Sequence, residues 1–162
     1  MSNTNSARMK KAIWGFGFLT VLSFSACKHP AIFDKDEEIV DGSWLTTQKP
    51  KFEVEIEDSL QNTNVYINIR NSSCYPYRNI LLFINTTFPD GKVARDTLEC
   101  MLADDTGRWL GDGLGDIWDN RILFKKNVRF PQRGIYKFEF EQAMRLDPLP
   151  CIMDIGMRVE KK

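Results

Sequence analysis

Hydrophobic and polar residues alternate with a period of two along most of the chain after residue 50, as in strands with one buried face. In residues 52–57 the apolar side chains alternate with Glu53, Glu55 and Glu57, which we assign to a solvated strand face. Residues 80–84 are apolar throughout, as in a strand covered on both faces. Further alternating segments lie at residues 65–69, 98–102, 122–130, 136–140 and 151–159.

Turn-forming residues separate these segments, and Asp90-Gly91 between two apolar runs predicts a hairpin. Residues 142–146 are long enough for one helical turn, but we find no long amphipathic helix. Seven or eight strands in about 120 residues predict an all-β fold, an antiparallel, jelly-roll-like β-sandwich. We place this domain at residues 44–162.

Residues 1–26 have the composition of a lipoprotein signal peptide. Three basic residues precede an apolar stretch, residues 12–24, that is shorter than the roughly 20 residues needed to span a bilayer. Ser25-Ala26 then precede Cys27, and bacterial lipoproteins are cut before a cysteine placed in this way. We therefore predict that Cys27 carries fatty-acyl chains, palmitate among them, and anchors the protein to a membrane. Phe24 stands where such sites usually have leucine.

Charge and composition exclude other classes of protein. The chain has 22 Lys+Arg and 22 Asp+Glu, and without residues 1–26 it has 19 and 22, a net charge of −3. Neither balance suits a nucleic-acid binder, which needs a basic face. Hydrophobic residues form 43% of the chain, enough for a folded core. The charged run at residues 34–38 leads us to assign residues 27–43 to the lipidated cysteine and a flexible tether.

Few residues are available for catalysis or metal binding. His29 is the only histidine, so Ser-His-Asp or Cys-His catalysis in the body of the chain is excluded, and we expect neither a cofactor nor a metal site. Besides Cys27 there are Cys74, Cys100 and Cys151, so at most one internal disulfide can form. Cys100 and Cys151 lie in alternating runs, which predicts small buried side chains.

The segment 102–120 contains five aspartates, four glycines and two tryptophans. Its aspartates suggest calcium, its glycines a phosphate loop, and Trp109 and Trp118 a platform for sugar rings. A glycine-rich connection with both tryptophans tucked into the sandwich edge is the favoured interpretation. The Tyr75-Pro76-Tyr77 corner suits either a partner contact or a turn that packs on the sheet. We predict that Tyr75, Tyr77, Trp109 and Trp118 bind a partner protein, because tyrosine and tryptophan dominate interface hot spots.

Several motifs follow one another in a fixed order. They are YPYRNILLFI at residues 75–84, DTLECMLAD at 96–104, GRWLGDGLGDIWD at 107–119, FPQRGIYKFEFEQAMR at 130–145 and LPCIMDIGMRVE at 149–160. Together with the lipoprotein-type cysteine, they resemble the gliding-motility lipoprotein family GldH of Bacteroidetes.

This resemblance implies a non-enzymatic outer-membrane lipoprotein, and we place it on the periplasmic face in preference to the cell surface. It implies a role in gliding motility and type IX secretion, with other envelope proteins as partners and with Cys27 as the only functional residue to be carried over. A lipid-anchored carbohydrate-binding module is the alternative function.

Overall fold

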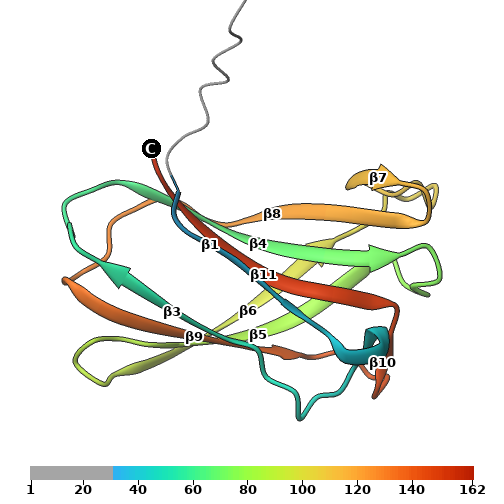
Figure 1. The fold of residues 1–162 in the computed structure, drawn as a ribbon, viewed down its shortest axis with the longest axis horizontal. Helices are drawn as coiled ribbons and strands as arrows, with labels where there is room; N and C mark the ends of the chain where they lie inside the picture. The colour runs from blue at the N-terminus through green and yellow to red at the C-terminus, as the bar shows by residue number, and fades with distance from the viewer. Residues whose placement is uncertain (1–30) are drawn as a thin grey trace, which may run out of the picture.

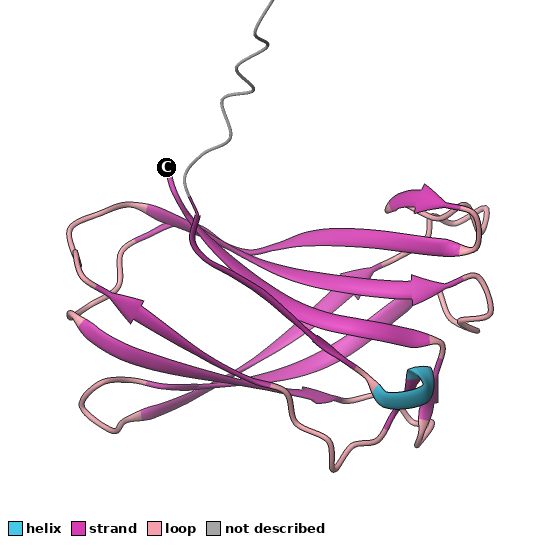
Figure 2. Cartoon of the chain, in the orientation of Figure 1, coloured by secondary structure: helices cyan, strands magenta, loops and turns pink. Residues whose placement is uncertain are grey.

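The computed structural model describes residues 31–162, which form two antiparallel sheets packed face to face (Figure 1, Figure 2). One sheet contains, in spatial order, β1 (Ala31–Glu38), β11 (Ile152–Lys161), β4 (Thr63–Ser72), β8 (Ile117–Val128) and β7 (Asp112–Leu114). The other contains β3 (Lys51–Ile56), β9 (Gly134–Gln142), β5 (Asn79–Thr87) and β6 (Val93–Met101). A two-residue pair, β2 (Ser43–Trp44) with β10 (Leu149–Pro150), and the 3-10 turn η1 (Val40–Gly42) complete the described elements. The predicted β-sandwich is confirmed.

The core lies between the two sheets, where alternate side chains of each strand meet. In strands β3, β4 and β5 every second residue is buried and the residues between are exposed or half-buried, which is why the period-two pattern in the sequence located them. The predicted solvated face of β3 is confirmed, since Glu53 and Glu55 are exposed. The strand at residues 80–84 is covered fully on one face only, because Leu81 and Phe83 are half-buried on the other.

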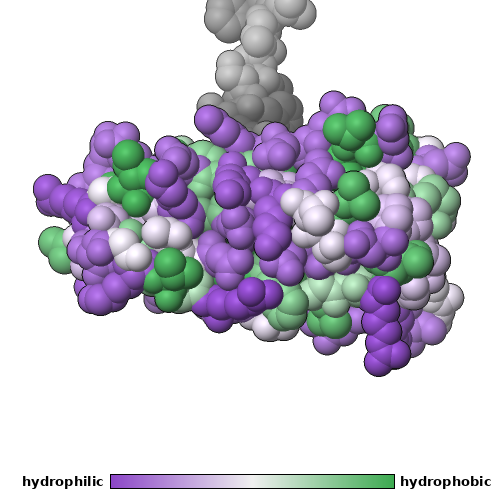
Figure 3. Space-filling model, turned by 90° about the horizontal axis from the view of Figure 1, so that it is seen from below, coloured by the Kyte–Doolittle hydropathy of each residue, from purple (hydrophilic) through white to green (hydrophobic). Residues whose placement is uncertain are grey.

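Seen from below Figure 1, the molecule is largely hydrophilic, with hydrophobic side chains in separate spots (Figure 3). The four-stranded sheet forms the lower side of Figure 1. Its outer face therefore carries no broad apolar patch that would require a covering partner.

The predicted tether at residues 27–43 is wrong from Ala31 onward. Residues Ala31–Glu38 form β1, which pairs with β11 along its length, and Ile39 after it is buried with 1% of its surface exposed. A charged run suits an edge strand as well as a linker, because an edge strand can expose most of its side chains and charges there protect the sheet from further pairing. The predicted signal peptide and Cys27 lie outside the described residues.

The other departures from the predicted elements are local. β11 has a register irregularity between Ile152 and Asp154, so the predicted alternation is wrong at its start, where Ile152 is buried and Met153 is not. It is confirmed further along, where Ile155, Met157 and Val159 are buried. The predicted helical turn at residues 142–146 is absent, since β9 continues to Gln142 and no helix follows. The Asp90-Gly91 hairpin between β5 and β6 is confirmed.

The sandwich has two ends that differ in composition. At one, which we call the terminal end, β1 begins beside the last residues of β11, with Ala31 opposite Glu160 (Figure 1). The opposite end, which we call the aromatic end, holds the loop after β4 and the segment 102–116 with the β7–β8 hairpin. No helix in residues 31–162 is long and apolar enough to cross a membrane.

Candidate functional site

Two segments far apart in the sequence lie against each other at the aromatic end. The backbone N–H of Ser73 donates to the carbonyl oxygen of Asp116 at 2.8 Å. The N–H of Leu102 donates to the carbonyl oxygen of Arg78, also at 2.8 Å. The Tyr-Pro-Tyr corner and the glycine-rich segment, both proposed for partner recognition, therefore share one end of the molecule.

A disulfide between Cys74 and Cys151 fastens the corner to the start of β11. Cys151 is therefore not the small buried side chain expected from the alternation. Cys100 is buried and free, as expected, and burial raises the pKa of its thiol to about 12. A thiol held protonated in this way is a core residue and not a nucleophile.

The two tyrosines of the corner have different roles. Tyr75 has 4% of its surface exposed, and its hydroxyl donates to the carbonyl oxygen of Asn79 at 2.9 Å. Burial raises the pKa of this phenol. Tyr77 packs edge-on against Tyr75, with ring centroids 5.8 Å apart, but keeps 38% of its surface exposed. Tyr75 is thus part of the core, which removes it from the predicted contact surface and leaves Tyr77 available.

Trp109 and Trp118 stack on each other, with ring centroids 6.2 Å apart and an angle of 27° between the rings. Trp109 also packs against the core, and the indole N–H of Trp118 donates to the hydroxyl of Ser73 at 3.0 Å. The Trp118 ring lies over Gly113 on the neighbouring strand, where a Cβ would come within 2.3 Å of it. Both rings are engaged within the chain, so they hold the β7–β8 hairpin in place.

Two aspartates of this segment, Asp104 and Asp105, make separate structural contacts. Asp104 accepts hydrogen bonds from Thr106 and Arg108, which lower the pKa of its carboxyl to about 2. Asp105 pairs with Arg78. Within residues 31–162, no group of three or more acidic, histidine or cysteine side chains is arranged to hold a metal ion.

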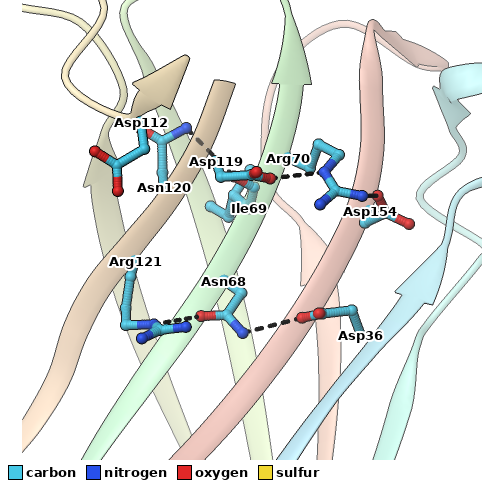
Figure 4. A pocket seen from close by; sticks show the side chains of 9 residues that line it. All are labelled: Asp36, Asn68, Ile69, Arg70, Asp112, Asp119, Asn120, Arg121 and Asp154. Atoms are coloured by element: carbon cyan, nitrogen blue, oxygen red, sulfur yellow. Dashed lines mark hydrogen bonds and ion pairs between the residues drawn. The ribbon is translucent and has the colours of Figure 1, made fainter. Parts of the chain in front are cut away.

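A polar hollow of about 410 Å³ opens on the outer face of the five-stranded sheet (Figure 4). Its first row of side chains runs across β1, β4 and β8: Asn68 donates to Asp36 at 3.0 Å and accepts from Arg121 at 3.3 Å. Gly156 of β11 lies between Asp36 and Asn68, and a Cβ there would come within 1.7 Å of the Asp36 carboxylate. The missing side chain lets Asp36 reach across β11 to Asn68.

The second row of the hollow is centred on Arg70. Its guanidinium donates to Asp119 of β8 at 2.6 Å and to Asp154 of β11 at 3.1 Å, and Asp112 of β7 lies at the end of the row (Figure 4). Burial raises the pKa of the Asp154 carboxyl, with Asp36 contributing to the same direction and Arg70 opposing it. The row therefore carries more negative than positive charge.

A wider groove of about 820 Å³ continues from the hollow toward the aromatic end. One side is apolar, with Leu114 and Ile117 of the β7–β8 hairpin, and the Cys74–Cys151 disulfide also lines it. Its charged lining residues are Glu38, Asp41, Asp119 and Asp154 against Arg70 alone. The groove can thus accept a segment that combines an apolar side chain with positive charge.

The groove was not predicted from the sequence, although Leu114 and Ile117 lie inside the segment that was. Its other side comes from η1 and the end of β1, residues that had been assigned to the tether. Strand pairing between β1 and β11 brings them together, and neither composition nor period reveals which strands are neighbours.

The family described as GldH lipoprotein matches residues 31–159, from the first residue of β1 almost to the end of β11. The chain belongs to the GldH lipoprotein family. It is 37% identical, over 94% of its length and 98% of the relative, to a protein of Christiangramia forsetii named gliding motility lipoprotein GldH homolog. It is 29% identical, over 91% of its length and 96% of the relative, to the gliding motility lipoprotein GldH of Flavobacterium johnsoniae. The resemblance inferred from the motifs is confirmed.

Proposed function

We propose that the protein is an outer-membrane lipoprotein, acylated at Cys27 and held on the periplasmic face. It serves the gliding-motility machinery and its associated type IX secretion apparatus without catalysing a reaction. The names of the Christiangramia and Flavobacterium relatives support the link to gliding. The basic, apolar and Ser25-Ala26-Cys27 pattern at the N-terminus supports export and acylation.

Within this role, the aromatic end is the surface that recognises another envelope protein. One observation carries this proposal: of the twelve large hydrophobic residues that are exposed within residues 31–162, eight lie in the loops and strand ends of that end. They are Val40, Leu45, Tyr77, Met101, Leu110, Leu114, Ile117 and Leu146. Apolar groups gathered on one part of a surface are typical of interaction sites, whereas the same groups scattered singly are ordinary.

Charge defines the partner further. Four carboxylates and one guanidinium line the groove between η1 and the β7–β8 hairpin. A partner segment with lysine or arginine beside an apolar side chain would match both the charge and the apolar wall. The carboxylates would then select the partner and speed association more than they strengthen binding.

The test compares two exposed hydrophobic positions in the full-length, tagged protein expressed in its native envelope. Leu114→Asp changes the apolar wall of the groove, where the side chain is 87% exposed, and Ile135→Asp is the matched control on the outer face of the four-stranded sheet. We expect Leu114→Asp to reduce co-purification of envelope proteins at least tenfold and to impair gliding, with its melting temperature unchanged. Equal recovery of partners with both variants would refute recognition at the aromatic end.

A further inference from the structure

The position of β1 limits how far the folded domain can stand from a membrane. The strand begins at Ala31, so only three residues separate it from Cys27. Four Cα–Cα steps from Cys27 to Ala31 span at most about 14 Å even when fully extended. Since each headgroup layer is itself roughly 5–8 Å thick, an acylated Cys27 leaves no room for a flexible spacer.

We propose that the terminal end of the sandwich lies directly on the headgroup surface of the bilayer, with Leu60 inserted into it. This rests on the acylation of Cys27 proposed above. The bilayer is the surface that this end contacts, because the chain between Cys27 and the start of β1 is too short for the terminal end to move away from the lipid anchor.

The strand register identifies the residues of this end. Ala31 lies opposite Glu160 on β11, and the next residue, Lys161, lies opposite Thr63 at the start of β4. The N–H of Lys162 donates to the carbonyl oxygen of Asn62 at 3.0 Å. The loop from β3 to β4 is therefore held beside the strand that receives β1.

Leu60, in this loop, is the most exposed large hydrophobic side chain of the terminal end, with 72% of its surface exposed. Its N–H donates to the Asp58 carboxylate at 2.9 Å, which fixes the turn that presents it. Leu60 and Lys162 line the same shallow concavity. An apolar side chain next to a lysine suits the headgroup region, where the first reaches toward the acyl chains and the second meets lipid phosphates.

Lys126 and Arg129 add positive charge at this end. Lys126 is exposed near the end of β8, and the Arg129 side chain donates to Asn62 at 2.8 Å, so both lie around the start of β4. The opposite, aromatic end is then held about 30 Å away, because β4 runs from one end to the other over ten residues. In this orientation the groove lies near the end of the sandwich that is far from the bilayer.

The experiment uses the full-length acylated protein, purified from its native envelope and reconstituted in vesicles of phosphatidylethanolamine and phosphatidylglycerol. Leu60→Cys and the matched Leu114→Cys are each labelled with an environment-sensitive NBD probe; both positions are exposed, Cys100 is buried, and Cys74 and Cys151 are bonded. A spin label near the top of the lipid acyl chains quenches probes at the headgroup boundary. The mass of the N-terminal peptide from the same sample records acylation.

We expect at least twofold quenching and a blue-shifted emission for the probe at position 60, with neither change at position 114. If Cys27 is acylated but the probe at 60 is unquenched, or both positions respond equally, the orientation is wrong while the lipoprotein assignment stands. If Cys27 carries no lipid and the protein does not bind vesicles, both the orientation and the proposed anchoring fail.

Discussion

Gly113 is placed under an indole ring that leaves no space for a side chain. Its φ lies outside the left-handed region, so alanine fits the backbone there, and in open space Gly→Ala would stabilise by about 0.4–1 kcal/mol. The sign of the effect is instead decided by Trp118, whose ring atoms would be 2.3 Å from the new Cβ. An aromatic ring cannot yield as the tip of a flexible side chain can.

We therefore expect Gly113→Ala to lower the free energy of unfolding by about 1–3 kcal/mol through overpacking. Urea titration followed by tryptophan fluorescence measures this, and the signal also reports on Trp118 itself. Leu114→Ala, one residue away and almost fully exposed, is the control and should stay within about 0.5 kcal/mol of the unchanged protein. An unchanged or raised stability for Gly113→Ala would mean that the ring does not occupy this space.

At the scale of elements, the sequence predicted strands well where one face is buried and poorly where neither is. β3, β4 and β9 have clear alternation because one face of each strand is buried in the core between the two sheets. β1 shows no such signal, since its residues from Asp34 to Glu38 are all exposed and its stability comes from backbone pairing with β11. Strand partners and bulges are set by contacts between distant segments, which a local pattern does not contain.

The site shows the same limit. The aromatic residues were predictable as a group from composition, but only the fold shows that Tyr75 is buried while Tyr77 is exposed. The row through Asn68 depends on Gly156, which stands between β1, the strand of Asp36, and β4, the strand of Asn68. Both strands are 84 or more residues away from Gly156 along the chain. Such a row becomes visible only when the register of the sheet is known.

The disulfide joins two elements of the aromatic end that have no other covalent link nearby. It closes a loop with a sequence separation of 77 residues, for which the chain-entropy relation gives about 4.5 kcal/mol of stabilisation. We expect the double variant Cys74→Ala/Cys151→Ala to lose stability of this order in urea. Dithiothreitol should lower the stability of the unchanged protein by a similar amount and leave the double variant unaffected. A midpoint that does not move in either comparison would contradict a bridge between these two cysteines.

At the scale of the whole molecule, the decisive question is where the folded domain begins. A domain starting at residue 44, as the sequence alone predicted, would lack β1 and leave the edge of β11 unpaired. It would also lack Ile39, which is almost fully buried, and Phe33, which packs edge-on against Phe52 with ring centroids 6.1 Å apart. Burial of one isoleucine side chain alone contributes about 1.5–3 kcal/mol.

We therefore expect the fragment 44–162 to be less stable than the fragment 31–162 by at least about 2 kcal/mol, because it lacks the buried side chain of Ile39 and the whole of β1. It should also associate, because an exposed β11 edge can pair with a second copy. Urea midpoints and size-exclusion chromatography of the two fragments measure both effects. If both fragments have the same urea midpoint and both are monomers, residues 31–43 act as a tether. The domain would then be free to stand away from the bilayer. A large difference would instead fix β1 as part of the body, so that the three residues after Cys27 set the distance to the membrane.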